Sequence, residues 1–310
     1  MTSVLSWLQK NADAKIAPRV KNMTDKTILV TGGAGFIGMH LCRSLLQAGN
    51  RVISLDNYFT GLKENHVEGV EYFEGSTKDV SAIISVKPDL VFHLGEYSRT
   101  EESFNDFEVV WDSNIVGTHA VLEFCRTHNA KIVYAGSSTK FADEGAGRDQ
   151  SPYAWTKATN TDQVRNYGAW FNLPYAITYF YNVYGPGELA TKYGTVIAIF
   201  KKLYEEGKPL TVREPGTQRR HFTHIDDIVR GLMFVGEHGQ GDEYGLGSEE
   251  SFSIMEVAQM FGASVKMIPN RQGNRMNTEV DYSKAMNEFG WRAEHSLKEY
   301  IENITRAHKR

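Results

Sequence analysis

The sequence contains few cysteines, no long apolar run and no long run of basic residues. Its two cysteines, Cys42 and Cys125, lie in predicted helices among apolar neighbours, which indicates reduced core residues and favours a cytoplasmic location. No apolar stretch reaches the length of a membrane span, and the N-terminus lacks the apolar core of a signal peptide. The net charge of −4, without a basic tract, argues against nucleic-acid binding. No membrane or nucleic-acid partner is therefore expected.

What the chain does contain is a regular alternation of predicted strands and helices. Its 310 residues, 41% of them hydrophobic, suffice for two closely packed domains or one large one. This order predicts an α/β fold, a doubly wound parallel sheet of the Rossmann type covered by helices on both faces. Right-handed crossovers bring the loops at the carboxyl ends of the strands to one rim. The predicted strands are Thr27–Thr31, Arg51–Leu55, Val70–Phe73, Asp89–Leu94, Lys131–Ala135 and Tyr175–Phe180, and the long helical patterns are Phe107–Thr127 and Tyr153–Phe171.

A glycine-rich segment, Thr31–Gly38, follows the first predicted strand and precedes a helical pattern. Gly32 permits a sharp turn, Gly35 lets backbone N–H groups approach a pyrophosphate, and Gly38 lets the helix pack closely on the strand. The second predicted strand is followed by Asp56, roughly twenty residues further on, where a carboxylate binds ribose hydroxyls and would repel a 2′-phosphate. The alternative is a plain glycine-rich turn beside a solvated aspartate. Strand, spacing and acid together favour an NAD site.

The regularity fades after Phe180, where Gly185-Pro186-Gly187 breaks the chain. We therefore predict an N-terminal extension over 1–26 without assigned chemistry, an NAD-binding Rossmann domain over 27–180, and a smaller mixed α/β lobe over 181–310 that is partly interleaved with it. A lobe placed over the rim is suited to holding a substrate against the cofactor. Its predicted elements are helices near Thr195–Glu206, Asp226–Phe234, Met255–Phe261 and Leu297–Ala307, and a strand near Leu210–Arg213.

Tyr153 and Lys157 are one helical turn apart, so they share a face of the predicted helix that begins after Ser151-Pro152. A phenol with the reference pKa of about 10 is a poor base at neutral pH, but a neighbouring ammonium stabilises its phenolate. Tyr153 is thus a candidate base that removes a proton from a sugar hydroxyl while hydride leaves the same carbon. Ser137, after the fifth predicted strand, would hold the reacting oxygen. The alternative for this tyrosine and lysine is a pair of ordinary surface residues.

Together these features resemble one known family, the extended short-chain dehydrogenase/reductases, and more narrowly the NAD-dependent nucleotide-sugar epimerases and dehydratases. The resemblance runs from about Thr27 to the end of the chain. It implies bound NAD, a reaction that is redox-neutral overall, a nucleotide-sugar substrate, and a homodimer. The dimer's four-helix bundle would use the helices near Phe107–Thr127 and Tyr153–Phe171. The segments that carry the resemblance are Thr31–Gly38, Asp56, Tyr134–Thr139, Ser151–Lys157, Tyr179–Gly187 and Gly216–Asp227.

The resemblance also assigns roles to individual residues. Ser137, Tyr153 and Lys157 match the family's catalytic residues. Two arginines, Arg220 and Arg271, match those that grip the diphosphate with paired guanidinium donors. The expected cofactor contacts are Gly32, Gly35, Phe36, Ile37, Gly38, Asp56, Asn57, Ser76, Thr77, Leu94, Gly95, Asn114, Tyr153, Lys157 and Tyr181. The expected substrate contacts are Glu96, Ser138, Thr139, Asn182, Thr195, Arg220, Arg271 and Thr278.

Several positions depart from the family pattern. Ser76 stands where relatives carry an aspartate beside the adenine, which weakens or removes that contact. Glu96 stands where they carry a small residue, and both a substrate contact and a solvent-facing carboxylate are open for it. Arg219, unlike its neighbour, is expected to form a surface salt bridge. Thr278 lies where relatives gate the sugar's 2-substituent, which indicates that N-acetylated hexoses fit as well as plain ones.

The residues after Ser137 bear on the reaction. Ser138 and Thr139 occupy the positions of the Asp-Glu pair that related 4,6-dehydratases use, and the glutamate usual in related decarboxylases is missing too. A 4-epimerase needs only Tyr153, NAD and room for the keto-sugar to rotate. We therefore expect 4-epimerisation of a UDP-hexose or UDP-N-acetylhexosamine. A dehydratase or another keto-sugar-forming enzyme is the alternative, and a non-catalytic NAD-binding regulator is disfavoured because Tyr153 and Lys157 are both present.

A metal site is also conceivable near the start of the helix predicted over Asp226–Phe234. His221 and His224 are three residues apart and precede Asp226 and Asp227, but the group lacks a convincing third ligand. We expect no metal, and we expect one of the two acids to cap the helix.

Overall fold

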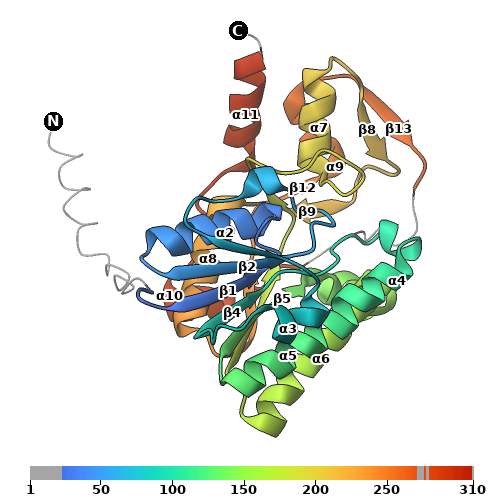
Figure 1. Ribbon diagram of the computed structural model, residues 1–310. Helices are drawn as coiled ribbons and strands as arrows, with labels where there is room; N and C mark the ends of the chain where they lie inside the picture. Colours follow the sequence, from blue (N-terminus) through green and yellow to red (C-terminus); the bar gives the residue numbers. More distant parts are fainter. Residues whose placement is uncertain (1–22, 271–275, 277–278, 309–310) are drawn as a thin grey trace, which may run out of the picture.

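The computed structural model describes residues 23–270, 276 and 279–308. In this part of the chain, seven parallel strands form one sheet in the order β11-β6-β5-β4-β1-β2-β3 (Figure 1). The predicted parallel α/β fold is confirmed. The strands are β1 Thr27–Thr31, β2 Arg51–Asp56, β3 Glu71–Glu74, β4 Leu90–His93, β5 Lys131–Ser137, β6 Tyr175–Phe180 and β11 Gly241–Leu246.

Six of these strands were predicted to within two residues, whereas β11 was not predicted. Its sequence is polar and glycine-rich, and only its second half, from Tyr244 to Leu246, is buried. It pairs with β6 through a register shift between Gly241 and Tyr244. Because β11 comes from beyond residue 180, a segment of the C-terminal half completes the large sheet, and the proposed boundary at 180 stays a prediction.

Helices cover both faces of the sheet (Figure 1). One apolar cluster joins Ile28 and Val30 to α2 Phe36–Gln47, α8 Ile225–His238 and α10 Ser283–Phe289. The opposite cluster joins Leu29 to α3 Val80–Ile83, α5 Gly117–His128 and α6 Pro152–Phe171. Successive residues of β1 thus point to opposite faces, and both faces are buried, which explains its unbroken apolar sequence.

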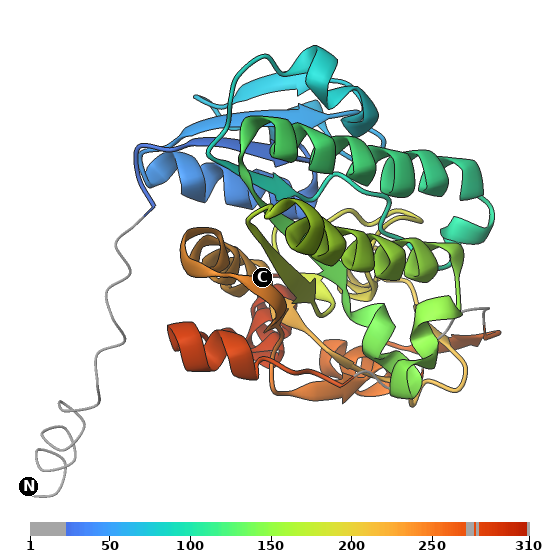
Figure 2. The ribbon, with the colours of Figure 1, turned by 90° about the horizontal axis from the view of Figure 1, so that it is seen from below.

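The long helix predicted over Phe107–Thr127 is present, with an irregular centre. It consists of α4 Phe107–Val110, a π-helical segment Trp111–Val116, and α5. Its neighbour α6 begins as predicted, with Ser151 Oγ accepting the Ala154 N–H at 3.1 Å and proline in the first turn. The two lie side by side across one face of the sheet (Figure 2). Single π turns in α-helices are frequent at functional sites.

The C-terminal lobe gathers around its own apolar cluster of α7, α9 and α11, above the sheet in Figure 1. Its elements are α7 Val196–Glu205, α9 Ile254–Phe261, α11 Leu297–His308, and the strand pairs β7 Val183–Tyr184 with β10 Thr223–His224, β8 Leu210–Arg213 with β13 Val265–Ile268, and β9 Arg219–His221 with β12 Ser251–Ser253. The remaining short turns are η1 Lys63–Asn65, η2 Thr77–Asp79, η3 Glu102–Phe104 and η5 Ser138–Asp149. Among the described helices, none has the length and apolar character that crossing a bilayer requires.

Candidate active site

The strand order reverses between β1 and β4, which are neighbours in the sheet although β2 and β3 separate them in sequence. In open α/β sheets, ligands bind in the crevice outside the strand ends at such a switch point. The glycine turn leaves β1 here, and Gly95 follows β4. A Cβ atom on Gly32, whose φ is 74°, would lie 2.9 Å from the Gly95 backbone. Only glycine lets the two chain segments meet so closely.

The first turn of α2 is shaped to receive an anion. Its N-cap is Gly35, which provides no side-chain acceptor for the first N–H groups of the helix. A Cβ on Gly38 would overlap the Gly32 carbonyl oxygen. Uncapped N–H groups at a helix N-terminus attract a phosphate group. The turn therefore fits the pyrophosphate of a dinucleotide.

Asp56, the last residue of β2, is buried beside this turn. Its Oδ2 accepts the Ala34 N–H at 2.9 Å and its Oδ1 accepts the Tyr58 N–H at 2.8 Å. Burial raises the pKa of Asp56, and these two N–H groups oppose that effect. Each carboxylate oxygen has a second lone pair, so the residue fits the predicted ribose contact.

The predicted catalytic residues converge at the carboxyl end of β5. The Tyr153 hydroxyl donates to Ser137 Oγ at 3.2 Å, and Thr139 Oγ1 donates to the same oxygen at 2.9 Å. Lys157 follows Tyr153 by one turn of α6, and its side chain is 6% exposed. The surface alternative for this tyrosine and lysine is therefore wrong. A hydroxyl, a phenol and an ammonium at one strand end can orient a substrate hydroxyl and remove its proton.

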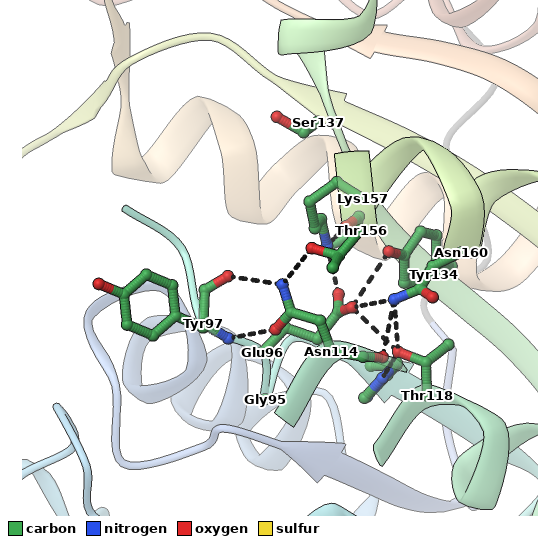
Figure 3. Close-up of polar contacts among 12 residues, drawn as sticks. Gly95, Glu96, Tyr97, Asn114, Thr118, Tyr134, Ser137, Thr156, Lys157 and Asn160 are labelled. Carbon is green, nitrogen blue, oxygen red and sulfur yellow. Dashed lines mark hydrogen bonds and ion pairs between the residues drawn. The ribbon is translucent and has the colours of Figure 1, made fainter. Parts of the chain in front are cut away.

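Glu96 does not face solvent, so that alternative is also wrong. Its side chain is 3% exposed and forms an ion pair with Lys157 (Figure 3). The carboxylate further accepts hydrogen bonds from Thr118, Tyr134 and Asn160. Protein donors thus surround the carboxylate of a residue that also lines the cavity, and its predicted substrate contact stays a prediction.

Asn114 lies in the π-helical segment and is fully buried. Its Oδ1 accepts the Tyr97 N–H at 2.7 Å, and its Nδ2 donates to the Tyr97 carbonyl oxygen and to Thr156 Oγ1 (Figure 3). The side-chain amide therefore ties the loop after β4 to α6. This is a framework role behind the pocket, where the resemblance predicted a cofactor contact.

A single cavity of about 660 Å³ runs from the glycine turn past the catalytic residues to the C-terminal lobe. Both ends of the predicted site therefore open into one space. The predicted site residues that line it are Gly32, Gly35, Phe36, Ile37, Gly38, Asp56, Asn57, Leu94, Gly95, Glu96, Ser137, Ser138, Thr139, Tyr153, Lys157, Asn182, Thr195 and Arg220.

Other predicted contacts do not line this cavity. The Ser76 hydroxyl caps η2. Thr77 is buried, and its hydroxyl packs so closely on Gly117 that a Cβ atom at Gly117 would clash with it. Tyr181 is a buried core residue in the cluster beneath β6, so its cofactor assignment finds no support. Arg271 and Thr278 lie outside the described residues.

The two neighbouring arginines differ as predicted. Arg219 is on the surface and pairs with Glu256 at 3.1 Å, which confirms its expected salt bridge. Arg220 lines the cavity, is 9% exposed, and donates to the carbonyl oxygens of Arg219 and Met276. Successive residues of β9 point to opposite sides, which explains the difference.

Two charged residues that also line the cavity, Arg99 and Glu188, were not predicted. Arg99 donates to the carbonyl oxygens of Tyr193 and Ser98, and burial lowers its pKa. Burial raises the pKa of Glu188 to about 8, although Arg99 opposes the shift. Within the described ranges no carboxylate lies within ion-pair distance of Arg99. Neither residue lies in a motif, and only tertiary packing brings them together.

The histidine and aspartate group at the start of α8 differs from the prediction. The capping residue is His224, whose Nδ1 accepts the Asp226 N–H at 3.3 Å, and not one of the acids. Asp227 is buried and bonded to Arg230 and to the backbone N–H groups of Glu294 and His295. His295 comes close to His224 and Asp226, with ligand atoms within 4.8 Å of one another. A third potential ligand is thus present that the sequence did not reveal.

The chain is similar to known proteins in sequence and in fold. A family model described as the NAD dependent epimerase/dehydratase family matches residues 28–247. The chain is 30% identical over 295 residues to UDP-glucuronic acid decarboxylase 6 of Arabidopsis thaliana, covering 88% of this chain and 85% of that protein.

Solved structures agree with this assignment. UDP-glucose 4-epimerase of Thermotoga maritima superposes with a TM-score of 0.83 at 25% identity, over 91% of this chain and 98% of that one. UDP-glucuronic acid 4-epimerase of Bacillus cereus, solved with UDP-glucuronic acid and NAD, superposes with a TM-score of 0.80 at 26% identity, over 91% and 99%. The chain is a member of the NAD-dependent epimerase/dehydratase family, with NAD as its cofactor.

Proposed function

We propose that the protein is a nucleotide-sugar 4-epimerase that acts on a UDP-hexose or UDP-N-acetylhexosamine through a transient 4-keto intermediate. The observation that carries this proposal is the hydrogen bond from Tyr153 to Ser137, both of which line the cavity that also contains the glycine turn. NAD, when bound, accepts and returns a hydride at the sugar carbon. All proton handling is left to the side chains at the end of β5.

Each of these side chains has a distinct task. Tyr153 takes the proton of the 4-hydroxyl and gives it back to the ketone. Ser137 holds that oxygen in line, and Thr139 fixes the Ser137 hydroxyl through the 2.9 Å hydrogen bond. Lys157 stabilises the phenolate. Arg220, at the lobe end of the cavity, would bind the diphosphate with its guanidinium.

The residues after Ser137 support epimerisation over dehydration. Ser138 and Thr139 line the cavity and carry hydroxyls, which are poor acids and bases for eliminating water. A 4-epimerase needs no second acid, only space for the ketone to present its other face. The choice of UDP follows the UDP-sugars named for the relatives.

The test is incubation of purified protein with UDP-glucose, UDP-N-acetylglucosamine, UDP-glucuronic acid and dTDP-glucose, with products identified by NMR and mass spectrometry. Conversion of a UDP-sugar to its 4-epimer at unchanged mass supports the proposal. Loss of water to a 4-keto-6-deoxy product, or loss of carbon dioxide, would overturn it.

One observation favours a second candidate, an enzyme that forms a keto-sugar from a UDP-uronic acid. Arg99 is a cavity cation that has no carboxylate within ion-pair distance among the described residues, and a uronic acid would supply one. The similarity to UDP-glucuronic acid decarboxylases points the same way. Turnover of UDP-glucuronic acid, either with release of carbon dioxide or to its 4-epimer, would establish this candidate, and 4-epimerisation of UDP-glucose or UDP-N-acetylglucosamine without turnover of UDP-glucuronic acid would support the first.

We also propose a homodimer in a reducing cytoplasm. Large apolar side chains lie exposed on α4, the π-helical segment and α6, among them Phe107, Trp111 and Trp155, with the two tryptophan rings stacked 6.0 Å apart. Exposed apolar patches of this kind mark interaction surfaces. Light scattering should give twice the chain mass, and Trp111→Asp should give a monomer. Cys42 and Cys125 are buried free thiols, which fits the compartment.

A further inference from the structure

The feature that the proposed reaction leaves unexplained is the carboxylate of Glu96. It follows β4 in the segment Leu94-Gly95-Glu96 and reaches under α6, where its Oε1 accepts from Thr118 Oγ1 at 2.9 Å, Asn160 Nδ2 at 2.8 Å and the Tyr134 hydroxyl at 3.2 Å (Figure 3). Its Oε2 accepts from Lys157. A side chain with this many donors is held in one position.

Lys157 is fixed from its other side as well. Its ammonium also donates to the Ala135 carbonyl oxygen and lies 4.4 Å from the centre of the Tyr134 ring. An ammonium has three N–H donors. Two are directed at Glu96 and Ala135, which leaves one for a ribose hydroxyl or for the Tyr153 oxygen. The lysine therefore enters the reaction already paired with a negative charge.

This pairing changes the electrostatics of the base. A bare ammonium beside Tyr153 would favour the phenolate strongly, and a carboxylate paired with that ammonium offsets part of the effect. Because both side chains are shielded from solvent, water screens their charges poorly. Tyr153 then experiences the combined charge of Lys157 and Glu96 and not the charge of the lysine alone.

Other titratable groups also lie near the Glu96–Lys157 pair, but none of them replaces Glu96 as the counter-ion of the lysine in the described chain. His93 on β4 is fully buried between Thr31 and Thr118, and burial lowers its pKa to about 4, so it is neutral in the working range. Burial raises the pKa of Tyr134 on β5 far above its usual value. On the open side, Arg99 in the loop after β4 interacts with Tyr153 and with Glu188. In the described chain, Glu96 is thus the anion that contacts Lys157.

We propose that Glu96 is a positioning residue that holds Lys157 in place and moderates its charge, so that the ion pair sets the pH at which Tyr153 becomes an active base. This inference rests on the proposed role of Tyr153 as the base. It goes beyond that role by assigning a function to a carboxylate whose hydrogen-bond partners all come from the protein.

The decisive variant is Glu96→Gln, which keeps the side-chain volume and most hydrogen bonds but removes the charge. With the ammonium uncompensated, the acidic limb of the kcat–pH profile should move to lower pH by about one unit or more. The ionisation of Tyr153, followed by NMR of ¹³C-labelled tyrosine in NAD-free protein, should move in the same direction. Glu96→Asp, which restores the charge, should return both midpoints toward the wild-type values.

The matched control is Glu71→Gln, which removes a carboxylate from a surface ion pair with Arg51 and should move neither midpoint. A Glu96→Gln protein with reduced kcat but wild-type midpoints would overturn the proposal, since a purely structural role predicts that result. If Glu96→Gln does not fold, ¹³C NMR of glutamate carboxyls in the wild type decides. Glu96 must be ionised between about pH 6 and 9, and a protonated Glu96 there excludes the pair.

The NMR titrations need no substrate. A wrong assignment of the sugar or of epimerisation would therefore appear in the product analysis and leave them unchanged.

Discussion

The Glu96 carboxylate and the Lys157 ammonium form an ion pair in which 3% and 6% of the two side chains are exposed. The residues are 61 positions apart in sequence and come from the loop after β4 and from α6. The pair joins the cofactor crevice to the catalytic helix, because Gly95 packs on the glycine turn and Glu96 holds the lysine. The two contacts lie on consecutive residues of the segment after β4.

Replacing Tyr153 with phenylalanine should lower turnover by about 10²- to 10⁴-fold and leave NAD bound. The phenol is the proposed proton acceptor, whereas the glycine turn and Asp56 form the cofactor crevice. NAD released on denaturation and the rate of sugar conversion measure the two effects. Tyr175→Phe, on β6 outside the cavity lining, serves as control and should keep both. Unchanged turnover in Tyr153→Phe would show that the base lies elsewhere.

Alanine at Gly38 and at Gly35 should have different consequences. The Gly38→Ala Cβ would overlap the Gly32 carbonyl oxygen, so we expect a loss of about 1–3 kcal/mol in the free energy of unfolding and little NAD binding. The Gly35→Ala Cβ would lie 3.2 Å from the same oxygen, so the NAD-free protein should stay close to the wild type in stability. Denaturant unfolding of both NAD-free proteins tests this, and equal stabilities would contradict the packing account.

The Asp227→Asn variant should be destabilised by about 1.5–3 kcal/mol at neutral pH. Burial by itself would raise the pKa of Asp227, but Arg230 and the N–H groups of His295 and Glu294 hold it below its usual range. A depressed pKa stabilises the folded state above the unfolded value of about 3.9, and this contribution is lost as the pH falls through the folded pKa.

The difference in Tm between wild type and Asp227→Asn should therefore shrink as the pH falls below about 4. The control is Asp226→Asn, whose side chain is 61% exposed and should cost little. A difference that does not change with pH would rule out the charge as the cause.

Glu188 should affect stability in the opposite direction from Asp227, because its carboxylate form destabilises the folded state. Its pKa is raised to about 8, mainly by burial, so the folded state favours the protonated acid. Glu188→Gln should raise Tm at pH values above the unfolded pKa of about 4.3, and the gain should grow until about pH 8 and then level off. Thermal unfolding across this range measures it. The control is Glu205→Gln, which removes a carboxylate from an exposed ion pair with Lys201 and should show no such trend in Tm. If the Tm of Glu188→Gln also shows no trend, Glu188 is ionised at neutral pH and the expectation is wrong.

Local features of the sequence predicted much of the fold and the centre of the site. Strands that are buried on both faces have short apolar sequences, so they can be recognised. The site motifs can be recognised for a similar reason, because each involves only a few neighbouring residues: the glycine turn, Asp56 and the Tyr153–Lys157 spacing. The β11 strand was missed because half of it is exposed and it needs β6 as a template. The place of Thr278 over the sugar lies outside the described residues and stays a prediction.

The sequence by itself determined the parallel sheet, the dinucleotide turn and the placement of Tyr153 and Lys157 on one face of a helix, since backbone conformation and helical spacing act over a few residues. Only the tertiary structure decided that Glu96 turns inward to Lys157, that the Asn114 amide braces the loop after β4, and that Arg99 and Glu188 share the cavity. These outcomes join segments tens of residues apart. Whether a charged side chain at the cavity contacts water, substrate or another protein group depends on how the helices and loops pack on the sheet.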